Sequence, residues 1–265
     1  MGKVIGIVSI KGGVGKTSVS ASLAADLANR CGKRVLLIDA NYSAPNLGLH
    51  MDILSPEKTI HDALNGRIRF SSAIHSRYKV DVIPGSYVFD KRINSLRLRD
   101  KIKRVKDEYD FVIIDSSPSL NEEILSSILA SDNLFIVSTP DYPTLSCSLK
   151  IAKLARQRDR IISGIILNKV KDSRYELNIS EIEEAMGVPV IAKLNNEMRY
   201  DRALFYRMPM SIYDKKSKFS REIHNLSLAL INGKEGRSIF KSIFSFNKSR
   251  EEVNRQILKE SFYTK

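Results

Sequence analysis

A loop that binds phosphate is predicted at residues 9 to 18, which read SIKGGVGKTS. Its glycines allow backbone conformations that other residues avoid, so successive N–H groups can point at one anion. Lys16 supplies positive charge for the terminal phosphates of a nucleotide, and Thr17 supplies a hydroxyl for Mg²⁺. Lys11 lies too early in the loop to duplicate the work of Lys16. The predicted nucleotide contacts are Gly12, Gly13, Val14, Gly15, Lys16, Thr17 and Ser18.

Two aspartates at the ends of apolar runs are candidate ligands for a magnesium ion. Asp115 ends the run FVIID, and Asp39 ends the run RVLLID. Taken alone, either aspartate would be read as a helix cap or a turn residue. Because both follow predicted strands and accompany a phosphate loop, they are expected to hold Mg²⁺ together with Thr17.

Strand-like and helical segments alternate along the chain, which is typical of a doubly wound α/β sheet with ligands at the carboxyl ends of its strands. Several predicted strands are apolar throughout, as in a parallel sheet that is covered on both faces. We expect a mostly parallel sheet of seven or eight strands with helices on both faces. The predicted strands are Lys3–Ser9, Arg34–Asp39, Lys79–Ile83, Phe111–Asp115, Asn133–Ser138, Ile161–Asn168 and Val188–Leu194. The predicted helices include Thr17–Cys31, Ile93–Lys106, Asn121–Ala130 and Thr144–Arg158.

The composition indicates an anionic partner and excludes two kinds of metal protein. A net charge of +13 over 265 residues favours contact with a membrane surface or nucleic acid, although a generally basic proteome is an alternative. Cys31 and Cys147 form no CxxC pair, so neither a zinc knuckle nor a cysteine-ligated iron–sulfur cluster is supported. No signal peptide or membrane-spanning run is visible, so a cytoplasmic protein is expected. Surface or packing roles are expected for the histidines, His50, His61, His75 and His224.

Several motifs, in order, resemble the MinD/ParA family of ATPases. The stretch KGGVGKT resembles the family's deviant Walker A loop. The stretch VLLIDANYSAPNLGL resembles its first switch segment, and FVIIDSSPSL resembles its Walker B strand. Its next strand and helix resemble LFIVSTPDYPTLSCSLK, and its adenine-side strand resembles GIILNKV. The similarity covers residues 3–231 and comes closest to archaeal-type MinD members. It implies a P-loop NTPase fold and an ATPase that uses ATP/ADP and Mg²⁺.

The resemblance also implies a role for Lys11. In the family, the equivalent lysine reaches across a dimer interface to the phosphates of the other subunit. ATP is then held between two subunits, and each site is complete only in the dimer. We therefore expect an ATP-dependent homodimer, with a solvated loop charge as the alternative role of Lys11.

The first switch segment departs from the family pattern. Typical members carry Asp-x-Asp, whereas this chain has Asp39 and Asn41. An amide can orient the attacking water but cannot accept its proton, so hydrolysis is expected to be slow, dependent on an activating partner, or absent. Alternatively, Asn41 is only a turn residue and Asp39 does the polar work. The expected catalytic residues are Lys11, Lys16, Asp39 and Asn41.

Two asparagines are expected beside the base of the nucleotide. Asn168 matches the family residue that pairs with the adenine edge. Asn195 stands where relatives often place a proline, so the contacts on that side of the base are left open. The preference for ATP over GTP is implied by the resemblance alone.

The C-terminal part of the chain, residues 233–265, is expected to be a basic helical tail that follows an ATPase domain over residues 1–232. Residues 234–248, KEGRSIFKSIFSFNK, place apolar and basic side chains on opposite faces of a helix. This pattern suits an anionic membrane surface and resembles the membrane-targeting helix of MinD proteins. The sequence continues with a second helical segment after residue 248, which favours packing on the domain or on a partner subunit as an alternative. The apolar residues of that segment are Val253, Ile257, Leu258 and Phe262.

A second basic region lies at residues 91–106, KRINSLRLRDKIKRVK, with eight Lys/Arg and one acidic residue. It is either a solvated helix face or a surface for nonspecific DNA binding. The leading hypothesis is a MinD-like, ATP-dependent dimerising switch that positions partner proteins at the inner face of the cell membrane. The alternatives are a ParA-like partitioning ATPase that binds DNA and an ATP-binding protein with little turnover. The sequence does not identify the protein cargo or the activating partner.

Overall fold

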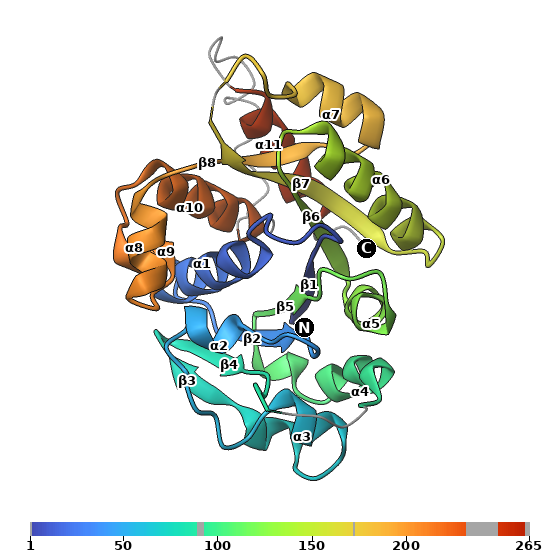
Figure 1. Cartoon of the computed structure of the whole chain (residues 1–265), viewed down its shortest axis with the longest axis vertical. Helices are drawn as coiled ribbons and strands as arrows, with labels where there is room; N and C mark the ends of the chain where they lie inside the picture. Colours follow the sequence, from blue (N-terminus) through green and yellow to red (C-terminus); the bar gives the residue numbers. More distant parts are fainter. Residues whose placement is uncertain (1, 89–92, 172, 232–248, 263–265) are drawn as a thin grey trace.

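The described residues form an eight-stranded sheet with helices on both faces (Figure 1). The computed structural model describes residues 2–88, 93–171, 173–231 and 249–262. The strand order is β3-β4-β2-β5-β1-β6-β7-β8, and β3–β4 is the antiparallel pair of an otherwise parallel sheet. The strands are β1 (Lys3–Val8), β2 (Val35–Ala40), β3 (His75–Arg77), β4 (Val80–Ile83), β5 (Phe111–Ser116), β6 (Asn133–Ser138), β7 (Ile161–Val170) and β8 (Val190–Asn195). The predicted doubly wound α/β class is confirmed.

The strand that sequence analysis missed is β3, at the edge of the sheet. It has only three residues, and none of them is apolar, so it carries no alternating pattern. Tyr78 and Lys79 follow it with φ values of 52° and 60°, which is the conformation of a tight two-residue hairpin. The hairpin turn takes Lys79 out of the strand that was predicted to begin there.

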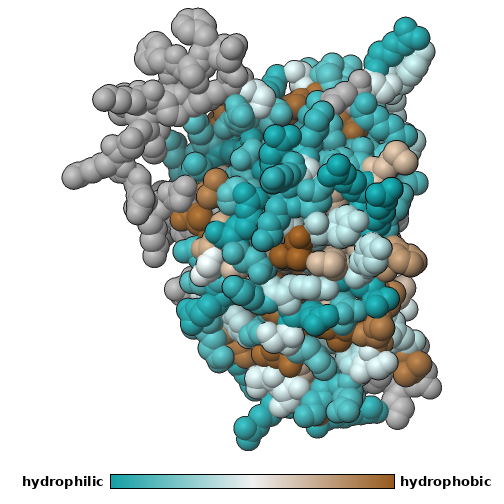
Figure 2. All heavy atoms as spheres, turned by 90° about the vertical axis from the view of Figure 1, so that its left-hand side faces the viewer, coloured by the Kyte–Doolittle hydropathy of each residue, from teal (hydrophilic) through white to brown (hydrophobic). Residues whose placement is uncertain are grey.

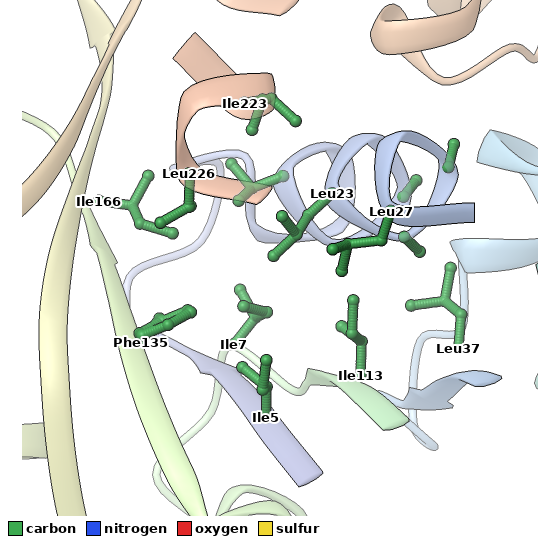
Figure 3. Close-up of a cluster of buried hydrophobic side chains, with 14 of the residues drawn as sticks. Ile5, Ile7, Leu23, Leu27, Leu37, Ile113, Phe135, Ile166, Ile223 and Leu226 are labelled. Carbon is green, nitrogen blue, oxygen red and sulfur yellow. The ribbon is translucent and has the colours of Figure 1, made fainter. Parts of the chain in front are cut away.

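Helices cover the sheet in two layers. On one face, α1 packs over the central strands, with Leu23 directed at Ile7 of β1 and Leu27 at Ile113 of β5 (Figure 3). On the same face, α10 packs beside α1 and over β8, at the edge of the sheet. On the other face, α3 and α4 cover one half of the sheet, and α5, α6 and α7 cover the other half. The helices are α1 (Lys16–Asn29), α2 (Leu47–His50), α3 (Ile60–Leu64), α4 (Leu98–Lys103), α5 (Glu122–Ala130), α6 (Tyr142–Arg156), α7 (Ile179–Met186), α8 (Arg199–Phe205), α9 (Met210–Tyr213), α10 (Lys218–Ile231) and α11 (Arg250–Ser261).

The single helix predicted over Ile93–Lys106 is wrong. The structure has a 3₁₀ turn at Ser95–Arg97, the short helix α4, and a second 3₁₀ turn at Lys106–Glu108. Three buried apolar residues, Leu98, Ile102 and Val105, anchor little more than two helical turns against the sheet. The remaining side chains are mostly basic, and like charges on neighbouring turns repel, so nothing extends the helix beyond its packed part.

The last helix, α11, packs against β8 of the sheet and against α10. Leu258 and Phe262 are each only 2% exposed, and the Phe262 ring stacks on Phe135 of β6 with 6.4 Å between centroids. Arg255 is also buried, and its guanidinium donates to the Ile191 carbonyl of β8 at 2.9 Å and pairs with Glu222 of α10. The segment after residue 249 therefore contributes to the core, although Val253 and Ile257 point to solvent.

The segment expected to contact a membrane, residues 234–248, lies outside the described residues, and the domain boundary drawn at residue 232 stays a prediction. Within the parts that the structure describes, no helix combines the length and the apolar character needed to cross a bilayer. The face that carries α8, α9 and α10 is mainly hydrophilic, with small and separate apolar areas (Figure 2).

Candidate nucleotide site

The phosphate loop joins β1 to α1 at the centre of the sheet. Gly13 and Gly15 have φ values of 78° and 89°, in the left-handed region that favours glycine. A Cβ on Gly15 would lie 2.3 Å from Nδ2 of Asn168, so only glycine fits there. Gly15 is also the N-cap of α1 and offers no side-chain acceptor, whereas Asn121 and Asp141 cap α5 and α6 with theirs. The first N–H groups of α1 are thus left for an anion.

Lys16 is the first residue of α1 and is 7% exposed. Burial lowers the pKa of its ammonium group, and the charge of Asp115 opposes this shift. A buried lysine beside open helix N–H groups is suited to hold the phosphates of a nucleotide in a water-poor site.

Asp39 and Asp115 lie side by side on β2 and β5, where they form a register pair. Both are fully buried. Burial raises the pKa of Asp39 to about 8, and the charge of Asp115 contributes to this rise. The backbone N–H groups of Asn41 and Leu47, which donate to Asp39 at 3.1 Å each, oppose it. Burial raises the pKa of Asp115 to about 6, and Thr17, Lys16 and Ser20 oppose that rise.

These carboxylates fit a divalent cation. Asp115 accepts a hydrogen bond from Ser20 through Oδ1 at 3.0 Å, while its Oδ2 is buried with no partner among the described residues. Two adjacent buried carboxylates disfavour one another's charge, and a cation between them and the phosphates would offset that cost. Thr17 lies in the first turn of α1, and its hydroxyl donates to Asn46 Oδ1 at 3.1 Å. Thr17, Asp39 and Asp115 are therefore the residues that would hold Mg²⁺.

Side chains of the segment after β2 hydrogen-bond within the segment and to α5. Asn41 is 7% exposed, and its amide Nδ2 donates to the carbonyl of Ala44, so in this conformation it holds the turn. Ser43 donates to Glu123 of α5, the helix that follows β5. Sequence analysis missed Glu123, because an acidic residue in the first turn of a helix is ordinary.

Asn168 and Asn195 come together beside the phosphate loop. Asn168, near the end of β7, is 5% exposed and donates from Nδ2 to the Val14 carbonyl at 2.8 Å. Asn195 ends the neighbouring strand β8. A pocket beside them is lined by Gly15, Asn168, Lys169, Asn195, Asn196, Glu197, Tyr200, Met210 and Phe219. Tyr200, which is half-buried, offers aromatic surface to a base, whereas Phe219 is buried behind it, and no sequence pattern had singled out either residue.

Lys11 has an exposed side chain at the mouth of the loop, and its backbone N–H donates to Ser9 Oγ at 3.3 Å. It lies within electrostatic reach of Asp141, the N-cap of α6. Burial raises the pKa of Asp141, but hydrogen bonds from Thr139 and Thr144 and the charge of Lys11 outweigh the burial and lower it. The structure thus places Lys16 inside the site and Lys11 at its rim.

Comparison with known proteins identifies the family. A family model described as an AAA domain matches residues 2–163. An uncharacterized ATP-binding protein of Methanocaldococcus jannaschii is 31% identical over 249 residues, which cover 93% of this chain and 94% of that protein. The crystal structure of the cell division ATPase MinD of Pyrococcus furiosus matches with a TM-score of 0.81 and 29% identity, over 86% of this chain and 98% of that chain. This chain belongs to the MinD/ParA family of P-loop ATPases.

The family also provides a structure with a bound nucleotide. The septum site-determining protein MinD of Pyrococcus horikoshii, in complex with Mg-ADP, matches this MinD/ParA chain with a TM-score of 0.80 and 27% identity, over 86% of this chain and 95% of that chain. The resemblance noted in the sequence is therefore confirmed at the level of family and fold. The roles of individual residues, Asn41 and Asn195 included, stay predictions.

Proposed function

We propose that this MinD/ParA ATPase is an ATP-dependent dimerising switch that positions partner proteins at the inner face of the cell membrane. The observation that carries the proposal is that the two lysines of the loop differ in position and exposure. Lys16 is buried at the start of α1 and suffices for the phosphates of its own site, whereas Lys11 is exposed at the rim. A charge at the rim is placed to enter the site of a second subunit.

Within one subunit, the loop N–H groups and Lys16 hold the phosphates of ATP, and Thr17, Asp39 and Asp115 hold Mg²⁺. The ion supplies positive charge that neutralises the phosphate oxygens. The pocket beside Asn168 and the ring of Tyr200 receives the base. Nucleotide and Mg²⁺ binding are also supported by the Pyrococcus horikoshii MinD relative, which was solved with Mg-ADP.

Turnover is proposed to be slow because the switch segment lacks a second carboxylate. The amide of Asn41 is tied to the Ala44 carbonyl, and releasing it to orient water requires the switch segment to rearrange. Such a rearrangement is a step that an activating partner could promote. ATP then holds the dimer closed for long periods, and hydrolysis releases it.

Substitution of Lys11 tests the dimer. Lys11→Ala should bind fluorescent ATP as the wild type does but stay monomeric with Mg·ATP in light scattering. Lys171→Ala is the matched control, since Lys171 is also exposed but lies beyond β7. Full dimerisation of Lys11→Ala would refute the proposed role.

The membrane contact rests on the sequence of residues 234–248, whose apolar and basic sides suit anionic lipid. A dimer would carry two such segments and gain avidity without any new contact. Because Leu258 and Phe262 are part of the core, the test keeps the whole chain and changes Phe240 and Phe244 to Glu. The double variant should lose cosedimentation with anionic liposomes in Mg·ATP, whereas Ile257→Glu on the exposed side of α11 should retain it.

A ParA-like, DNA-binding switch is the second candidate, and α4 favours it. Arg97, Arg99, Lys103 and Arg104 are exposed, while Leu98 and Ile102 face the sheet. Burial, followed by the charges of Arg97 and Arg104, lowers the pKa of Lys101, which indicates crowded positive charge. Cosedimentation with DNA in ATP and in ADP tests this candidate. Binding that falls steeply with salt and is lost on reversing Arg99 and Lys103 to Glu would favour it over the membrane.

A further inference from the structure

Three side chains with metal-binding atoms meet at the C-terminal end of α1, the end away from the phosphate loop. Asp26 lies in the last turn of α1, Cys31 just beyond the end of that helix, and His224 on α10. One ligand atom from each lies within 4.8 Å of the other two. Asp26 is fully buried, and its Oδ2 lies 2.9 Å from His224 Nδ1. We propose that Asp26, Cys31 and His224 bind a zinc ion that joins α1 to α10.

The donor set selects the metal. A thiolate, an imidazole and a carboxylate are ligands that Zn²⁺ accepts in four-coordinate sites, whereas Mg²⁺ and Ca²⁺ require mostly oxygen. Three protein ligands leave one position for water, and the partial exposure of Cys31 and His224 gives water access. Each zinc ligand bond is about 2.0 to 2.3 Å long, which places tetrahedral ligand atoms roughly 3.3 to 3.6 Å apart. Asp26 Oδ2 and His224 Nδ1 are 2.9 Å apart and all three ligand atoms lie within 4.8 Å of one another, so small side-chain rotations would bring them to that spacing.

The electrostatic surroundings also suit a cation. The site lies at the C-terminal end of α1, where the carbonyl groups of the last turn carry partial negative charge. Arg30 pairs with Asp26 through Oδ1 at 3.4 Å, and a bound metal would replace the hydrogen bond that joins Oδ2 to His224 Nδ1 at 2.9 Å. On binding, the Cys31 thiol gives its proton to the solvent and the sulfur becomes a ligand.

Burial, with the charge of Asp26, raises the pKa of Cys31 to about 11, while Arg30 and Lys33 oppose that rise. In the metal-free protein Cys31 is therefore a thiol. Arg30 and Lys33 favour the thiolate but do not outweigh burial, so a metal must displace the thiol proton when it binds.

The zinc site is separate from the nucleotide site. Asp26 lies ten residues after Lys16 on α1, about 15 Å along the helix axis. The histidine was expected to have a surface or packing role, because Cys31 and His224 are far apart in the sequence and show no ligand spacing. The packing of α10 on α1 is what creates the cluster.

Cobalt binding tests the proposal on the whole chain, after chelator treatment and with Mg·ADP present to occupy the nucleotide site. Titration with Co²⁺ should produce a thiolate-to-cobalt charge-transfer band and tetrahedral d–d bands that saturate at one equivalent, and Zn²⁺ should displace them. Cys31→Ser should remove the charge-transfer band, and His224→Gln should weaken Co²⁺ binding at least tenfold. Cys147→Ser is the matched control and should behave as the wild type, because Cys147 is the other half-buried thiol.

Thermal unfolding provides a second readout that does not depend on a spectrum. Zn²⁺ should raise the melting temperature of the wild type and Cys147→Ser but not of Cys31→Ser, with far-UV circular dichroism and Mg·ADP binding confirming that each variant is folded. Absence of a thiolate band in the wild type would overturn the proposal. So would a band that survives in Cys31→Ser or disappears in Cys147→Ser.

Discussion

The buried pair Asp39 and Asp115 predicts an unusual pH dependence of stability in the absence of metal. Burial and the neighbouring carboxylate raise the pKa of Asp39 to about 8, while an unfolded chain has the ordinary value near 3.8. Between these two values the folded protein binds the extra proton, so its free energy of unfolding falls as pH rises. The slope approaches about 1.4 kcal/mol per pH unit, which gives a loss of roughly 2 to 3 kcal/mol between pH 5.5 and 7.5.

Asp39→Asn removes this loss. The amide carries no charge but keeps only one oxygen, so one of the N–H groups of Asn41 and Leu47 loses its acceptor, at a cost of about 1 to 3 kcal/mol. At pH 5.5 these effects offset one another, and the two proteins should have similar stability. At pH 7.5 the variant should be more stable by about 2 to 3 kcal/mol, or some 4 to 10 °C in melting temperature.

The assay is chemical or thermal unfolding in EDTA, without nucleotide, at several pH values. Asp115→Asn is the matched comparison: with a pKa of about 6, Asp115 should contribute roughly a third as much as Asp39 to the pH-dependent change between pH 5.5 and 7.5. Saturating Mg·ADP should abolish the difference in slope, because the bound cation favours both ionised carboxylates. Parallel pH profiles for the wild type and Asp39→Asn would refute the reasoning.

Three further variants probe the site and the core. Asn41→Asp should raise the steady-state rate of ATP hydrolysis, because it restores the second carboxylate of the switch segment; an unchanged rate in a phosphate-release assay would contradict this. Gly15→Ala should abolish binding of fluorescent ATP, since its Cβ would meet Nδ2 of Asn168 at 2.3 Å and its φ is 89°; retained affinity would show that the loop can open elsewhere. Phe262→Ala should lower the free energy of unfolding in urea by about 3 to 5 kcal/mol, the usual cost of truncating a buried phenylalanine. A loss below 1 kcal/mol would mean that α11 does not contribute to the core.

The phosphate loop could be predicted from sequence because it is contiguous. Its glycines, Lys16 and Thr17 act through the backbone of one short segment between a strand and a helix, and their spacing alone implies the geometry. The alternation of apolar strands with helical segments likewise determined the fold class. The local pattern did not predict β3, whose three polar residues form a strand only because they pair with β4.

The tertiary structure decided which distant residues meet. The sequence placed Asp39 and Asp115 at strand ends, but only the insertion of β5 between β2 and β1 makes them neighbours. Burial raises the pKa of both carboxyl groups, and the charge of Asp115 adds to the rise at Asp39. Asn168 reaches the loop at Val14 across 154 residues, and His224 reaches Asp26 across 198. Strand order and helix packing are set by how the whole apolar surface is buried, and no short stretch of sequence contains that information.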